Sequence, residues 1–290
     1  MKKSRKLATL GICSALFLGL AACQQQHATS EGTNKRQSSS AKVPWKASYT
    51  NLNNQVSTEE VKSLLSAHLD PNSVDAFFNL VNDYNTIVGS TGLSGDFTSF
   101  THTEYDVEKI SHLWNQKKGD FVGTNCRINS YCLLKNSVTI PKLEKNDQLL
   151  FLDNDAIDKG KVFDSQDKEE FDILFSRVPT EATTDVKVHA EKMETFFSQF
   201  QFNEKARMLS VVLHDNLDGE YLFVGHVGVL VPADDGFLFV EKLTFEEPYQ
   251  AIKFASKEDC YKYLGTKYAD YTGEGLAKPF IMDNDKWVKL

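Results

Sequence analysis

The chain has 290 residues, of which 41% are hydrophobic, and its 32 basic and 40 acidic side chains give a net charge of −8. This composition excludes intrinsically disordered, collagen-like and small disulfide-rich proteins. Residues 1–22 contain four basic and no acidic side chains, so the rest carries 28 against 40, a net charge of −12, and we expect no nucleic-acid partner because phosphate backbones attract basic surfaces.

The first predicted element is a secretory signal peptide, residues 1–22. Its basic start precedes sixteen mostly apolar residues, fewer than the roughly 20 that span a bilayer. The segment ends in Leu20-Ala21-Ala22-Cys23, which resembles the lipobox of bacterial lipoproteins; an ordinary signal peptide with an incidental cysteine is the alternative. The resemblance implies cleavage before Cys23, a diacylglycerol on its thiol and a further acyl chain, such as palmitate, on its new amine. Since about two acyl chains anchor a protein stably, we expect it at the extracellular face of the cell membrane.

Residues 23–44 are predicted to be the lipidated cysteine and a flexible tether. Alanine is the only apolar side chain in residues 24–42, which therefore bury too little surface to offset the entropy of ordering. The segment 45–290 carries nearly all of the aromatic residues and is long enough to enclose a core. We therefore expect one folded domain over 45–290, in a monomeric protein with no second membrane-spanning segment.

The first half of this domain reads as helices. A capping-box pattern predicts that Ser57 opens the first helix, and the pair Asp70-Pro71 opens a second helix that ends at Gly89. A third helix is predicted over about 103–117. A fourth, shorter helix is predicted to start near Asn125.

The second half is predicted to be mainly strands. A short strand near 148–152 and helices near 166–176 and 186–200 come first. Strands are then predicted over 208–213, 221–231, 236–243 and 248–254, a helix after Ser256, and a closing hairpin over 280–288. Helices followed by an antiparallel sheet make an α+β fold, which is also the chain order of papain-like cysteine hydrolases.

Four cysteines remain once the signal peptide is removed, and one of them is a candidate nucleophile. Cys23 is assigned to lipid, which leaves an odd number. Cys126 and Cys132 lie six residues apart on one predicted helix, a rise of about 9 Å that no disulfide tolerates. Cys132 is in the apolar stripe and is expected to pack, as is Cys260. Cys126 is in the first turn, where free N–H groups and the helix dipole favour a thiolate.

A histidine and a carboxylate on neighbouring strands could complete the site. His226 lies between two glycines in a strongly β-forming run, and such glycines mark a close approach of a ligand or backbone. If Val231 pairs with Gly236, His226 stands opposite Glu241; a register shifted by two keeps the pair on one face as diagonal neighbours. A carboxylate so placed holds the imidazole and stabilises its protonated form.

These elements resemble NlpC-type peptidoglycan hydrolases and related papain-like amidases. Asn125-Cys126 replaces the acid-Cys pair of that family, His226-Val227-Gly228-Val229 matches its His-Val-Gly-Ile strand, and Glu241 takes the place of the polar residue on the next strand. The chain also resembles an uncharacterised domain family of bacterial surface lipoproteins through residues 123–134, 225–231 and 248–250. The upstream Tyr or Gln of the oxyanion hole has no counterpart. The Cys126 backbone N–H is one expected donor, with Asn125 as a candidate for the other.

Other motifs give no metal or cofactor site. Asp153-Asn154-Asp155 begins like a calcium loop, but the positions that follow do not fit, so a solvated turn is predicted. The spacing of Cys and His residues does not suit zinc. Four further histidines are expected at the surface or in loops: His102, His112, His189 and His214. We expect neither a metal nor a cofactor.

Three functions remain open. The first is a lipid-anchored cysteine hydrolase that cleaves amide bonds, in cell-wall (peptidoglycan) peptides, with the triad Cys126, His226 and Glu241. The second is a transglutaminase-like acyl transferase of the same architecture, in which an amine replaces water. The third is a non-catalytic lipoprotein that binds the wall or a ligand.

Overall fold

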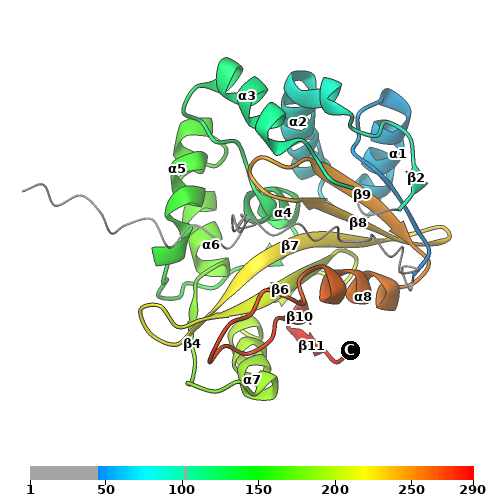
Figure 1. Cartoon of the computed structure of the whole chain (residues 1–290). Coiled ribbons are helices and arrows are strands. Elements are labelled where there is room, and N and C mark those ends of the chain that lie inside the picture. The colour runs from blue at the N-terminus through cyan, green and yellow to red at the C-terminus, as the bar shows by residue number, and fades with distance from the viewer. Residues whose placement is uncertain (1–44, 101–102) are drawn as a thin grey trace, which may run out of the picture. The chain divides into compact units, whose positions relative to one another are not determined.

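Helices and antiparallel strands make up the computed structural model, which describes residues 45–100 and 103–290 (Figure 1). The predictions for residues 1–22, Cys23 and the 23–44 tether lie outside these residues. The described part forms an α+β fold with eight α-helices, and its residues belong to one compact unit. Within it, no helix is long and apolar enough to cross a bilayer.

The helices begin at capping residues, several of which were predicted. They are α1 (Gln55–Ser66), α2 (Pro71–Val88), α3 (Val107–Lys118), α4 (Cys126–Leu134), α5 (Phe151–Gly160), α6 (Ser165–Leu174), α7 (Val186–Phe197) and α8 (Lys257–Lys267), with short 3₁₀ turns η1 (Gly89–Thr91) and η2 (Gln148–Leu150). Asp70, Asn125 and Ser256 cap α2, α4 and α8 as predicted. The prediction for Ser57 was wrong: Asn54 caps α1, and its side chain accepts the Ser57 N–H.

One large sheet contains most of the strands. The strands are β1 (Ala47–Thr50), β2 (Thr98–Ser99), β3 (Val138–Thr139), β4 (Val178–Pro179), β5 (Gln201–Phe202), β6 (Arg207–Asp215), β7 (Tyr221–Ala233), β8 (Gly236–Lys242), β9 (Tyr249–Phe254), β10 (Phe280–Asp283) and β11 (Lys286–Val288). The order in the sheet is β11-β10-β6-β7-β8-β9-β1-β2, with β4 also on β7 and with β3 and β5 paired separately. Strand β1 was not predicted, and the apolar run near 148–152 is helical rather than a strand.

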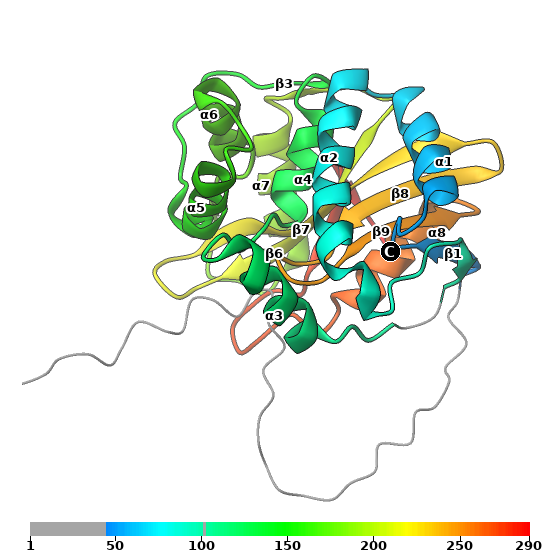
Figure 2. The same ribbon diagram turned by 90° about the horizontal axis from the view of Figure 1, so that it is seen from above.

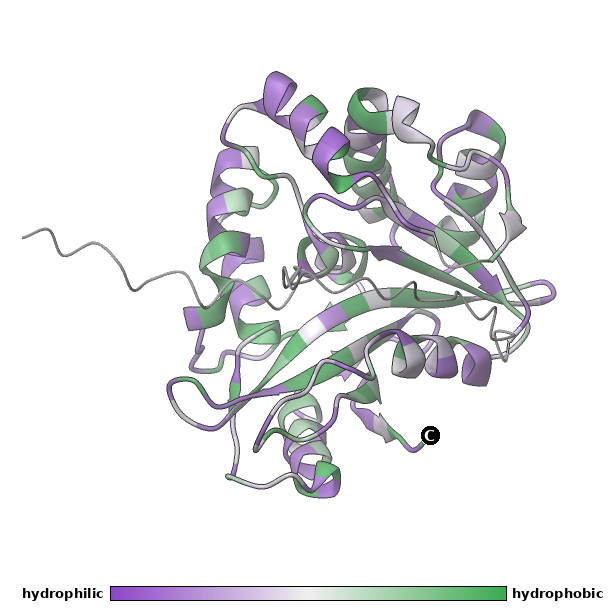
Figure 3. Ribbon diagram, in the orientation of Figure 1, coloured by the Kyte–Doolittle hydropathy of each residue, from purple (hydrophilic) through white to green (hydrophobic). Residues whose placement is uncertain are grey.

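Helices cover both faces of this sheet. In Figures 1 and 2, α1, α2 and α4 lie on one face and α8 lies on the other. The side chains of β7 divide accordingly: Val227 and Val229 join the core under α2 and α4, and Leu230 joins the core under α8. Figure 3 shows the central strands as mainly hydrophobic and the outer helices as mixed. The sheet is therefore buried on both faces, and polar side chains on it need partners.

A bulge interrupts β7 next to the candidate histidine. Val211 of β6 pairs with His226 and Val212 pairs with Val224, so Gly225 is an extra residue in β7. A Cβ at Gly225 would lie 2.3 Å from a methyl carbon of Leu213, so any other residue here would have to displace the Leu213 side chain. Bulges of this kind change the direction in which the next side chain points.

The pairing of β7 with β8 differs from the predicted register by two residues. Ala233 pairs with Gly236, because β7 runs two residues further than expected before it turns. Glu241 is therefore a diagonal neighbour of His226 rather than its direct partner, which is the second register considered above. The ladder ends at Val229–Val240, although β8 stays paired with β9 as far as Lys242–Tyr249. Beyond that point β7 and β8 diverge, and α4 lies behind the opening (Figure 1).

Candidate active site

The candidate nucleophile Cys126 is the first residue of α4. Asn125 is the N-cap, and its Oδ1 accepts the Ile128 N–H at 3.1 Å. This arrangement leaves the thiol at the positive end of the helix dipole, where a thiolate is stabilised. Cys126 is a free cysteine.

A buried ion pair fixes the start of α4 against α5 and β7. Arg127 donates from Nε and Nη2 to the two oxygens of Asp153, at 2.9 and 2.7 Å, and from Nη1 to the Val224 carbonyl at 2.9 Å. The Asn125 Nδ2 also donates to Asp153, at 2.8 Å. The prediction of a solvated turn at 153–155 was wrong, because Asp153 lies in α5 and is fully buried by these partners.

This ion pair was missed in the sequence, because Arg127 and Asp153 are far apart in the chain, and Asp153 was considered only as part of a calcium-loop pattern that does not fit. Arg127 also binds the carbonyl of Val224, which directly precedes the bulge at Gly225. The ion pair and this hydrogen bond therefore help to set the position of α4, and of Cys126, relative to His226. Since the Asn125 side chain caps α4 and binds Asp153, only one of its Nδ2 hydrogens remains for an oxyanion. That role of Asn125 stays a prediction.

His226 and Glu241 form a direct hydrogen bond. The distance from His226 Nε2 to Glu241 Oε2 is 2.5 Å. The other carboxylate oxygen, Oε1, accepts the Tyr263 hydroxyl at 2.5 Å and the Lys267 ammonium at 3.4 Å. Both of those residues belong to α8, and Lys267 Nζ donates to the Tyr263 hydroxyl oxygen at 2.8 Å. Helix α8 therefore holds the carboxylate that orients the imidazole.

The charges of these groups depend on one another. Burial disfavours the imidazolium, but the charge of Cys126, a hydrogen bond with its thiol and the contact with Glu241 outweigh burial and raise the pKa of His226. Because Nε2 is bonded to Glu241, the thiol is left with Nδ1. Burial likewise opposes ionisation of Glu241, yet Lys267, His226 and Tyr263 together lower its pKa to about 2. The arrangement favours an imidazolium beside a carboxylate.

The site is closed in this conformation. Cys126, His226 and Glu241 are each only 1% exposed. The Tyr268 ring stacks on the His226 imidazole, with centroids 4.9 Å apart and an interplanar angle of 23°, and the Tyr271 ring centroid lies 5.4 Å from that of Tyr268. The thiol therefore becomes accessible from solvent only if part of this cover moves.

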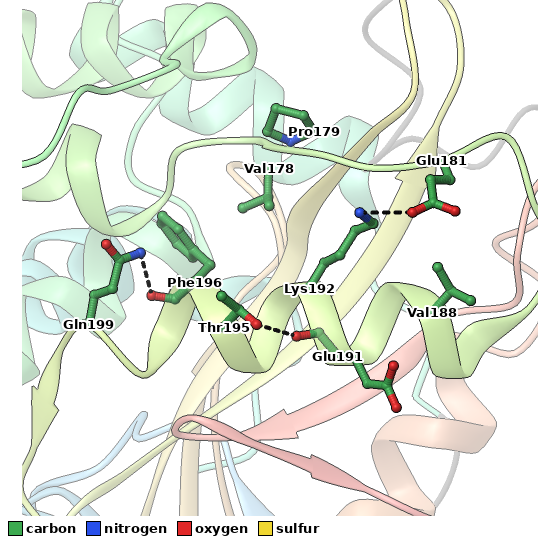
Figure 4. Close-up of a pocket in the computed structure, with 9 residues that line it drawn as sticks. All are labelled: Val178, Pro179, Glu181, Val188, Glu191, Lys192, Thr195, Phe196 and Gln199. Atoms are coloured by element: carbon green, nitrogen blue, oxygen red, sulfur yellow. Dashed lines mark hydrogen bonds and ion pairs between the residues drawn. The ribbon is translucent and has the colours of Figure 1, made fainter.

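A surface groove lies elsewhere, between β4 and α7 (Figure 4). Figure 4 shows the Lys192 ammonium directed at Glu181 across it, with Val178 and Phe196 on its wall. None of the predicted site residues lines this groove. Its shallow and mixed lining gives no reason to link it to the thiol.

The remaining cysteines and histidines fill other roles. Cys132 is buried, and burial raises its pKa to about 12, which suits packing; Cys260 is also buried and free. The prediction that His189 and His214 are surface or loop residues was wrong. Both are buried, with ring centroids 4.4 Å apart, because His189 lies on the inner face of α7 and His214 lies on β6. His112 is exposed as predicted, and His102 lies outside the described residues.

The fold and the site together define an α+β protein with a buried thiol, imidazole and carboxylate where two strands of an antiparallel sheet diverge. Residues 48–288 match the family described as a domain of unknown function, DUF4300, and the chain belongs to this family. No curated protein and no solved structure matches the chain.

Proposed function

We propose that this protein is a cysteine hydrolase that cleaves amide bonds, with Cys126 as nucleophile, His226 as general base and Glu241 as the residue that orients His226. The observation that supports it most is the position of the imidazole. One ring nitrogen is bonded to a charged carboxylate at 2.5 Å, and the other faces a thiol at the start of a helix. This is the relation in which a thiol is activated for attack on a carbonyl carbon.

The reaction then follows from the geometry. His226 Nδ1 holds the proton taken from Cys126, and the thiolate attacks the amide carbon to form a C–S bond. The backbone N–H of Cys126 points outward at the helix start and stabilises the oxyanion. The leaving amine takes the proton from His226 as the C–N bond breaks. Water, deprotonated by His226, then attacks the thioester and releases the acid and the thiol.

Papain-like architecture and a cell-wall substrate are further parts of the proposal. The helix with the cysteine, the strand with the histidine and the next strand with the acid follow one another in the order of papain-like and NlpC-like enzymes. A lipid on Cys23, followed by the polar segment up to residue 44, would hold the domain at the outer face of the membrane, within reach of wall peptides.

The test uses the full chain in detergent micelles with soluble peptidoglycan peptides. We expect new amine groups to appear with the wild type and with Cys132→Ser, and to fall at least about 10³-fold with Cys126→Ser, because Cys126 is the cysteine that contacts His226 within residues 45–100 and 103–290. Addition of a labelled amine separates the two enzymatic outcomes: incorporation of label identifies acyl transfer, and free acid identifies hydrolysis. A chain that forms neither product and whose Cys126 does not react with a thiol-directed activity probe would be a binding protein, and the proposal would fail.

A further inference from the structure

A buried lysine lies next to the candidate site on the opposite face of β8. Lys242 follows Glu241 directly and is only 1% exposed. Its ammonium donates to the carbonyl oxygens of Thr244 at 2.8 Å, of Phe245 at 3.2 Å and of Glu247. These three acceptors match the three N–H groups of a lysine ammonium. Lys242 is therefore an internal cation around which the turn between β8 and β9, residues 243–248, is folded.

Aromatic side chains complete the surroundings of this ammonium. Lys242 Nζ lies 4.2 Å from the centroid of the Tyr84 ring and 5.3 Å from that of Tyr249. The Tyr84 hydroxyl, from α2, donates to the carbonyl of Glu246. The carbonyls of all four residues 244–247 thus point inward, toward Lys242 or Tyr84. A charged lysine held by carbonyls and rings instead of a carboxylate is an unusual use of a residue that is rarely buried.

The turn packs against the segment that enters the nucleophile helix. The Phe245 carbonyl oxygen lies 3.4 Å from the position that a Cβ on Gly123 would occupy, three residues before Cys126. The Tyr249 hydroxyl, just after the turn, donates to Asn129 Oδ1 at 3.0 Å and lies 3.4 Å from the Thr124 hydroxyl. The residues before and after Cys126 are therefore supported by the turn and by the strand that follows it.

The titratable groups that face Lys242 come from its own turn and from α4, α2 and β9. Burial lowers the pKa of Lys242 to about 7, opposed by Glu246 and Glu247 in its own turn and by Cys126 at the start of α4. The rings that face it, Tyr84 on α2 and Tyr249 on β9, both have a pKa raised by burial and stay neutral. Cys126 is thus close enough to Lys242 to favour the charged form of the ammonium.

We propose that Lys242 is a positioning residue for the thiol chemistry: its ammonium holds the turn 243–248 against the start of α4 and so fixes the position of the Cys126 thiol. This inference rests on the proposed function for its purpose, but the contacts that carry it do not involve Glu241 or His226. It gives a role to Lys242, whose burial the thiol, imidazole and carboxylate do not explain.

The test compares Lys242→Met with wild type in the full chain, and reads out alkylation of Cys126 by iodoacetamide between pH 5 and 9. Mass spectrometry separates Cys126 from Cys132 and Cys260, which serve as internal references. Methionine keeps the length of the side chain and removes its charge. We expect Cys126, which is 1% exposed in the wild type, to be alkylated about 3- to 10-fold faster in Lys242→Met, because the turn no longer holds the start of α4 in place. Unchanged alkylation of Cys132 and Cys260 would show that the loosening is local.

Amide hydrogen exchange reports on the turn itself. We expect faster exchange in residues 243–248 of Lys242→Met, while Lys145→Met, which removes a partly buried lysine bonded to Asp172 and Glu169, leaves both readouts unchanged. If Lys242→Met does not fold, Tyr84→Phe removes only the hydroxyl on Glu246 and must still speed exchange in the turn. A wild-type alkylation profile or unchanged exchange in these variants would overturn the proposal. Alkylation needs no substrate, so these outcomes are independent of whether the chain cleaves amides.

Discussion

His226 lies between a thiol and a carboxylate, and each of the two contacts a different nitrogen of the imidazole ring. The carboxylate of Glu241 stays charged although it is buried, because Lys267 and Tyr263 bind its second oxygen. Gly228, two residues after His226, has no space for a side chain, since a Cβ there would lie 2.3 Å from the Phe239 ring. The charge of Glu241 and the small size of Gly228 thus both matter for the surroundings of the imidazole.

The substitution Glu241→Gln tests whether the carboxylate of Glu241 controls the charge of His226. The amide keeps the size of the side chain but loses the charge that helps to raise the pKa of His226, so we expect His226 to titrate at lower pH and cleavage to fall at least about tenfold. Imidazole NMR signals measured against pH give the first result directly. Glu220→Gln is the matched control, because Glu220 contacts His214 at 2.7 Å and should leave His226 unaffected. An unchanged His226 titration would contradict the assignment of Glu241.

At the scale of elements, local patterns predicted the structure well and distant side-chain pairs escaped prediction. Helix α4 and its cap at Asn125 follow from capping chemistry within a few residues, as do α2 and α8. The apolar run near 148–152 is too short to show a clear period and was assigned to a strand, whereas the structure has a 3₁₀ turn and the start of α5 there. The exact pairing of β7 and β8 depends on where the turn falls, which a pattern of period two does not fix.

The contact between α4 and α5 depends on Asp153, whose partner Arg127 could not be inferred from spacing. We expect Asp153→Asn to lower the free energy of unfolding by about 3 to 5 kcal/mol, because it removes the carboxylate charge that faces the mostly buried guanidinium of Arg127. Urea denaturation measures this change. Asp158→Asn, on the same helix, breaks the exposed pair with Lys168 and should cost about 0 to 1 kcal/mol. If Asp153→Asn lowered the free energy of unfolding by no more than Asp158→Asn does, the ion pair between Arg127 and Asp153 would add little to the stability of the fold.

At the scale of the whole molecule, the sheet explains why the site is closed. Helices cover both of its faces, and the thiol approaches the imidazole only where β7 and β8 separate. The sequence indicated the three residues of the site, but it carried no sign that Tyr268 would stack on His226 or that each member would be 1% exposed. Exposure depends on packing between segments far apart in the chain, which periodicity does not describe.

At the scale of the whole molecule, we expect the buried His189 to make a contribution to stability that is lost in mild acid. Burial, the largest effect, together with the neighbouring His214 lowers the pKa of His189. A folded pKa below the unfolded value of about 6.5 means that the unfolded chain binds the proton more readily, so stability is lost as the pH falls below about 6.5. The raised pKa of His226 acts in the opposite sense, since its contribution to stability is present below the unfolded pKa and lost as the pH rises through the folded pKa.

Thermal unfolding between pH 4.5 and 7.5 checks the contribution of His189. We expect the melting temperature of His189→Gln to fall less on acidification than that of the wild type, whereas His112→Gln, at an exposed position, should follow the wild type. Parallel curves for wild type and His189→Gln would mean that other groups cause the acid loss, and would leave the buried histidine pair as packing alone.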